Sequence, residues 1–98
     1  IYSNGWVLRE EGKALAMAGD VDGAIKKFEQ ALQRNPDLKF DPQNEAQQLA
    51  VAALITEGEK LAKENDVQGA IVKFQQAKTW NPELLIDPEV KARQNRSR

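Results

Sequence analysis

The sequence contains an internal repeat with a period of 46 residues. Residues 12–42 and 58–88 align without a gap, and 17 of the 31 aligned pairs are identical. A repeat of this length is typical of proteins in which one supersecondary unit stacks on the next. Because each unit contacts mainly its neighbours, such proteins present extended surfaces, and these bind partners more often than they catalyse reactions. The repeat therefore constrains both the architecture and the class of function.

Each copy of the repeat contains a stripe of apolar residues with helical spacing. The stripes comprise Val21, Ala24, Ile25, Phe28, Ala31 and Leu32 in the first copy, and Val67, Ala70, Ile71, Phe74 and Ala77 in the second. Steps of three and four residues place each set on one face of an α-helix. Asp20 and Asp66 precede the stripes and predict N-caps, and the Asn-Pro pairs at 35–36 and 81–82 predict the helix ends.

Two glycines fall inside the first turns of these predicted helices. Gly23 and Gly69 occupy the same repeat position, where glycine costs about 1 kcal/mol relative to alanine. Because both copies keep a glycine at this unfavourable position, we expect another backbone to approach each glycine closely.

Two Asp-Pro pairs, at 41–42 and 87–88, indicate where further helices begin. Each combines an N-cap acid with a proline at the first helical position. The first pair predicts a helix from Pro42 to about Glu64, and the second a shorter one from Pro88 to about Asn95. The first copy opens with a predicted helix from about residue 3 to 18. The links at 37–40 and 83–86 contain apolar residues that we expect to cover helix ends: Leu38, Phe40, Leu84, Leu85 and Ile86.

The predicted fold is all-α. We expect tandem antiparallel helix-turn-helix hairpins, with about four helices and a partial fifth, in a single domain over residues 1–98. The expected units are a first repeat at about 3–36, a second at about 42–82, and the first helix of a partial third at 87–96.

These residues resemble the tetratricopeptide repeat, an α-solenoid unit of two antiparallel helices. The matching positions are a glycine at the helix crossing (Gly12, Gly58), small contact residues (Ala24, Ala70, Ala31, Ala77), an aromatic residue in the second helix (Phe28, Phe74) and a closing proline (Pro36, Pro82). The resemblance covers residues 5–36 and 51–82. The sequence departs from the family in its longer period, which replaces the usual 34 residues, and at Glu11 and Glu57, where the family usually has leucine.

In this family the first helix of each hairpin lines the inner face, which binds peptides or proteins. Carried over by position, that face comprises Trp6, Arg9, Lys13 and Met17 in the first copy and Ala52, Ile55, Glu59 and Lys63 in the second. The resemblance thus implies a non-enzymatic interaction module or scaffold with a protein or peptide partner. Trp6 fits a core role and a binding hot spot equally well.

Self-association is the alternative interpretation. Repeat units bury their apolar faces against neighbours, and three or more are usually needed for stability. This chain holds two and a fragment of a third, so a homodimer through the long helix from Pro42, or by helix exchange, would supply the missing burial. Trp80 corresponds to Arg34 in the first copy, so it either packs on the 84–86 link or makes an intermolecular contact. We expect the segment to belong to a larger repeat or multidomain protein.

The composition argues against catalysis and cofactors. The chain has no cysteine and no histidine, which removes thiolate metal sites and the commonest general base. No glycine-rich phosphate loop and no calcium-loop pattern is present, so we predict no catalytic residues, no cofactor and no metal site. Charge-free stretches are too short or too polar to span a bilayer. The absence of cysteine is compatible with a reducing cytoplasm.

The charge distribution argues against nucleic acid as a partner. The last ten residues, 89–98, carry four basic side chains against Glu89, whereas the whole chain has a net charge of −1. The remainder of the chain is therefore acidic, and it lacks the basic surface that nucleic-acid binding requires. We interpret the basic tail as a solvated terminus.

Overall fold

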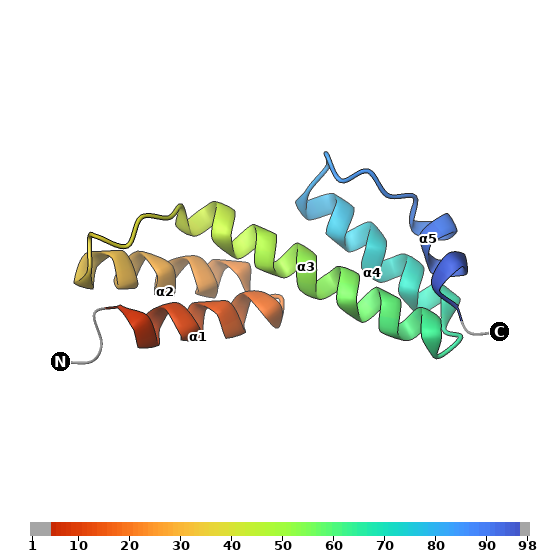
Figure 1. Cartoon of the computed structure of the whole chain (residues 1–98), viewed down its shortest axis with the longest axis horizontal. Coiled ribbons are helices and arrows are strands. Elements are labelled where there is room, and N and C mark those ends of the chain that lie inside the picture. Colours follow the sequence, from red (N-terminus) through yellow and green to blue (C-terminus); the bar gives the residue numbers. More distant parts are fainter. Residues whose placement is uncertain (1–4, 97–98) are drawn as a thin grey trace. The chain divides into compact units, whose positions relative to one another are not determined.

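The computed structural model describes residues 5–96, and these form an all-α structure (Figure 1). The helices are α1 (Trp6–Met17), α2 (Val21–Arg34), α3 (Pro42–Lys63), α4 (Val67–Trp80) and α5 (Pro88–Asn95). They pack as sequential hairpins, which confirms the predicted fold class. The predicted helix start at residue 3 lies outside the described residues, as does Arg98 of the basic tail.

The chain divides into two compact units, Ile1–Ala50 and Val51–Arg98. The first unit holds α1, α2 and the beginning of α3, and the second holds the rest of α3 with α4 and α5. Each unit has its own cluster of buried residues, so each is described by its own contacts. The assignment of residues 1–98 to a single domain stays a prediction.

In the first unit, small residues surround one aromatic ring. The buried cluster comprises Ala16, Val21, Ala24, Phe28, Ala46 and Ala50, with Leu15, Ile25, Phe40 and Leu49 packed against it. Phe28 is fully buried, and its ring meets that of Phe40 edge to face, with centroids 5.5 Å apart. This arrangement suits the quadrupoles of the two rings. The link residue Phe40 therefore closes the core, as predicted for an apolar link.

The second unit repeats this plan with its own residues. Its buried cluster comprises Ala62, Ala70, Ile71, Phe74 and Ala92, with Ile55, Leu61, Val67 and Ile86 packed against it. Phe74 takes the place of Phe28 and is also fully buried. Helix α5 contributes Ala92 and packs beside α4 (Figure 1). The partial fifth helix is thus part of this unit's core.

A glycine in the first helix of each hairpin makes room for the buried ring. A Cβ atom built on Gly12 would lie 2.6 Å from Cε1 of Phe28, and one on Gly58 would lie 2.5 Å from Cε1 of Phe74. Both distances are far below van der Waals contact. The close crossing that the family resemblance implied is therefore confirmed in both hairpins.

Aspartate caps begin the second helix of each hairpin as predicted. The amide of Gly23 donates to Oδ1 of Asp20 over 2.9 Å, and the amide of Gly69 donates to Oδ1 of Asp66 over 3.0 Å. The expectation that another backbone approaches these two glycines is wrong. A Cβ there would meet the capping carboxylate of the same turn, because that side chain folds back over the glycine to reach its amide.

The apolar links cover the cores with one exception. Leu84 and Ile86 are half-buried, but Leu85 between them is 99% exposed. The prediction is therefore wrong for Leu85. Burial alternates along the link from half-buried to exposed to half-buried, as it does where successive side chains point to opposite sides. Two neighbours facing the core leave the middle residue facing solvent.

We expect Gly58→Ala to destabilise the chain by roughly 1–3 kcal/mol, because the new methyl group collides with the buried Phe74 ring. Helix propensity alone predicts the opposite sign, a gain of about 1 kcal/mol. Urea unfolding followed by circular dichroism measures the difference. The matched control is Thr56→Ala, at an exposed position of the same helix, where helix propensity predicts a gain of about half a kcal/mol and no buried ring is met. A stabilised Gly58→Ala variant would contradict the close contact.

Removing a cap should weaken the hairpin by a separate route. Asp66→Ala leaves the Gly69 amide without its acceptor, and we expect a loss of about 1 kcal/mol of unfolding free energy. Asp66→Asn keeps an oxygen at the cap and should retain most of the stability. Thermal unfolding of both variants checks this, and an Asp66→Ala variant as stable as the unchanged chain would show that the cap contributes nothing.

Candidate partner-binding surface

The four residues predicted on the first helix form one stripe along α1. Trp6, Arg9, Lys13 and Met17 are separated by steps of three, four and four residues, so they share a helix face. We call this set the α1 stripe. Its two ends are large apolar side chains that remain in solvent, with Trp6 63% exposed and Met17 55% exposed. The core role that Trp6 could also have played is therefore excluded within the described residues.

Arg9 makes two contacts within the first unit that its sequence position did not indicate. Its guanidinium carbon lies 4.6 Å from the centroid of the Phe40 ring, and its Nη2 lies 3.6 Å from Oε1 of Glu45. A cation over an aromatic face is attracted by the ring quadrupole. Within residues 5–96 its buried Nε has no hydrogen-bond partner. Arg9 thus fastens α1 to the link and to the first turn of α3.

Lys13 lies between Arg9 and Met17 and keeps its charge near solvent. Its Nζ donates to Oε1 of Glu10, one turn back on the same helix, over 3.4 Å. Both side chains are more than one third exposed, so the pair contributes little to stability. The middle of the α1 stripe therefore carries an accessible positive charge between two apolar ends.

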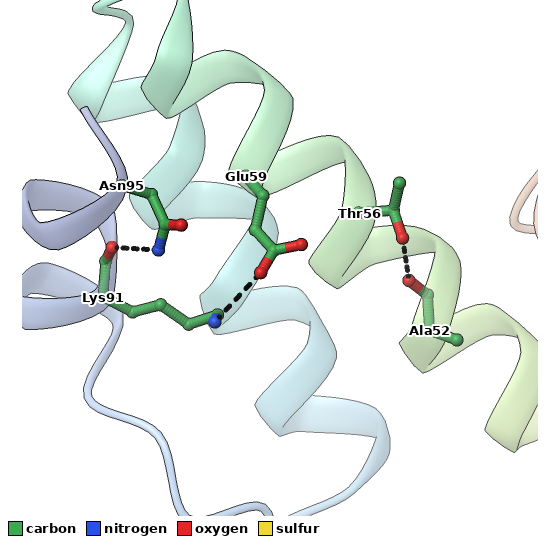
Figure 2. A network of polar contacts seen from close by, with 5 residues as sticks. All are labelled: Ala52, Thr56, Glu59, Lys91 and Asn95. Atoms are coloured by element: carbon green, nitrogen blue, oxygen red, sulfur yellow. Dashed lines mark hydrogen bonds and ion pairs between the residues drawn. The ribbon is translucent and has the colours of Figure 1, made fainter. Parts of the chain in front are cut away.

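The four residues predicted in the second copy have the same spacing but different surroundings. Ala52 and Lys63 are exposed, whereas Ile55 packs against the core of the second unit. Glu59 accepts a hydrogen bond from Nζ of Lys91 on α5 over 3.2 Å. Figure 2 shows the Lys91 side chain reaching from α5 to this carboxylate. Helix α5 therefore occupies part of the predicted face in this unit.

The same close-up shows how the backbone on either side of this ion pair is held. The hydroxyl of Thr56 donates to the carbonyl of Ala52 over 3.0 Å, and the side-chain amide of Asn95 donates to the carbonyl of Lys91 over 2.8 Å (Figure 2). The Asn95 contact joins two residues four positions apart in α5, so it adds a side-chain hydrogen bond to the short helix that presents Lys91.

Two salt bridges, one in each hairpin, involve the glutamates that stand where the family usually has leucine. Oε2 of Glu11 lies 3.2 Å from Nζ of Lys27, and Oε2 of Glu57 lies 3.0 Å from Nζ of Lys73. Each acid stands where the family usually has leucine, and each reaches across its hairpin to the second helix. The sequence held a signal for this contact, since both copies keep the same acid and the same lysine at the same spacing.

The second unit exposes large apolar residues that the first unit lacks. They are Val72 and Trp80 on α4, Leu85 in the link and Val90 on α5. The equivalent residues of the first copy, 46 positions earlier, are Lys26, Arg34, Lys39 and Asn44, and all four are exposed. Because the same fold is built with polar residues at these positions, packing within the unit does not require apolar ones. Only the difference at Trp80 was noted from the sequence.

Clusters of metal-ligating side chains and membrane-spanning helices were both sought in the described part of the chain. Within residues 5–96 no three histidine, cysteine, aspartate or glutamate side chains gather in a suitable group. The same residues include no helix with the length and apolar character needed to cross a membrane.

The comparisons with known proteins support one family. The profile of the tetratricopeptide repeat family matches residues 6–38, which comprise α1, α2 and the start of the following link. Such repeats are in general protein–protein interaction modules and are typically non-enzymatic. No curated protein and no solved structure matches the chain significantly. Residues 6–38 of this chain are therefore a tetratricopeptide repeat.

Proposed function

We propose that the chain is an interaction module that binds a protein or peptide through the α1 stripe. The supporting observation is the exposure of Trp6 and Met17 at the two ends of this stripe. Large apolar side chains left in solvent on one helix face are typical of binding surfaces. Tryptophan is also among the residues most enriched at the energetic centre of protein interfaces.

The chemistry of the stripe defines the kind of partner. Trp6 and Met17 are eleven residues apart, which corresponds to about 16 Å along a helix. A partner therefore needs two apolar anchors at about that distance, which an extended peptide of roughly five residues would span. An acidic side chain between the anchors would face Lys13. Methionine adapts to irregular apolar surfaces, so the second anchor is less restricted in shape.

The second-copy residues contribute differently to this proposal. Ala52 and Lys63 are exposed, but Ile55 and Glu59 already contact the core and α5. A partner at this part of the face would have to displace α5 or bind beside it. The α1 stripe is therefore the part of the predicted face that supports the proposal.

Substitution of the two anchors tests the α1 stripe. We expect Trp6→Ala to weaken partner binding about thirtyfold, as loss of a hot spot of roughly 2 kcal/mol does. Met17→Ala should have a smaller effect in the same direction. The partner is first captured from the parent lysate and identified by mass spectrometry, and its affinity for each variant is then measured by titration calorimetry.

Val7→Ala provides the matched control for these substitutions. Val7 is an apolar residue of α1 that is 46% exposed, but it follows Trp6 directly and so lies outside the α1 stripe. It should bind the partner as the unchanged protein does. If Trp6→Ala and Met17→Ala also bind normally, the α1 stripe is not the binding surface.

Self-association is the second candidate function, and one observation favours it. The four exposed apolar residues of the second unit have no apolar counterparts in the first, so they are available for contact with a second copy of the chain. Burial of such residues is what a small repeat array lacks when it is alone. In a symmetric dimer, the same residues of both copies would lie in the contact.

We expect a dimer at micromolar concentration that is lost when the apolar residues are exchanged for their first-copy equivalents. The double variant Trp80→Arg and Leu85→Lys installs residues that the same fold already carries in the first unit. Sedimentation equilibrium of the chain and of this variant checks the result. A monomer before any substitution would exclude this candidate and leave the α1 stripe proposal untouched.

A further inference from the structure

Each hairpin of this chain receives a short segment that carries the same sequence pattern. We call residues 40–50 the first docking segment and residues 86–95 the second. Both begin with a large apolar residue and an Asp-Pro pair, and both then have two further residues, a charged residue and an alanine. Ala46 and Ala92 are fully buried, and Phe40 and Ile86 pack against the cores of their units. The two segments are therefore equivalent in how they dock.

The charged residue of the pattern has opposite sign in the two segments. Glu45 of the first docking segment pairs with Arg9 at 3.6 Å, whereas Lys91 of the second pairs with Glu59 at 3.2 Å. The charge on the hairpin surface that faces each segment also changes sign. The first presents Arg9 and Lys13, and the equivalent positions of the second hold an isoleucine and Glu59.

An aromatic ring lies near the cation of each pair. The Arg9 guanidinium is 4.6 Å from the Phe40 centroid, and Nζ of Lys91 is 5.4 Å from the Phe74 centroid. The cation belongs to the hairpin in the first unit and to the docking segment in the second. All four charged side chains are partly buried, so solvent screens the charges less than on an open surface.

We propose that Arg9 and Glu59 are specificity-determining residues, which make each hairpin accept its own docking segment and reject the other. Exchange of the segments would place Lys91 beside Arg9 and Lys13, and would place Glu45 beside Glu59. The Asp-Pro start and the buried alanine are shared, so they do not discriminate. Like charges brought together are a common means of excluding the wrong partner.

The proposal also defines what the second hairpin can take in place of α5. The preferred segment has a large apolar residue, Asp-Pro, two free positions, a lysine or arginine, and then alanine. The resident example is α5, and the same segment of a second copy satisfies the pattern equally. The site on the second hairpin contains no residue of the α1 stripe, so its failure to bind a peptide would leave the α1 stripe proposal unaffected. In the first unit, Arg9 and Lys13 belong both to the stripe and to the selection of the docking segment.

Charge reversal in the intact chain tests the selection directly. Lys91→Glu should lower the unfolding temperature by about 3 °C more than Lys91→Gln, since it adds repulsion to the loss of the pair. The double variant Glu59→Lys with Lys91→Glu should recover most of the loss. In the first unit, Glu45→Lys should likewise be worse than Glu45→Gln. Equal effects of reversal and neutralisation in both units would overturn the proposal.

Binding in trans gives a second measurement. Ala92→Asp buries a charge at a packed position and so releases α5 within the full chain. To this variant we would add a labelled peptide of residues 84–96, and the same peptide with Lys91→Glu. We expect the lysine peptide to bind about fivefold more tightly, and Glu59→Lys in the chain to reverse the order. Equal binding of the peptides, or binding by neither, would overturn the proposal.

Discussion

The contact between a buried phenylalanine ring and a glycine determines how each hairpin is built. Phe28 rests on Gly12 and Phe74 rests on Gly58, so the two helices of each hairpin approach where a side chain would otherwise separate them. The residues around each ring must then be small, which explains why alanine dominates both buried clusters. With the ring side of α1 turned toward α2, the opposite side of α1 is left to solvent. The exposure of Trp6 and Met17 is therefore a consequence of the crossing.

The features that were predictable from the sequence depend on residues close in the chain or on the repeat. The caps at Asp20 and Asp66 follow from three-residue contacts, and the proline positions give the helix ends. The features that were not predictable depend on how segments distant in the sequence pack against one another. Glu59 was placed on an open face because nothing in its own helix indicates that α5 reaches it. Leu85 was expected to cover a helix end, because a short link has no periodicity long enough to show which side chain faces outward.

The two copies act as an internal comparison that separates packing from other roles. Most positions that line the ring and the crossing are the same in both copies, since the same contact must be made twice, although Phe40 of the first core is replaced by Ile86 in the second. Exposed positions that differ are those that the fold leaves undetermined. Lys39 and Leu85 occupy the same repeat position, and both are exposed. The fold therefore does not require a leucine there. The same reasoning applies to Lys13 and Glu59, which share a repeat position but face opposite charges.

Helix α5 shows why a modest charge pair can decide which segment docks. It is eight residues long and buries only Ala92 among its own residues, so packing holds it weakly compared with the hairpin helices. Isolated helices of this length are unstable in water, and most of the order of α5 must come from its contacts with the hairpin. Where the total binding free energy is small, one favourable or repulsive charge is a large fraction of it. A strongly packed helix would dock whatever its charge, whereas α5 is short enough for Glu59 to discriminate.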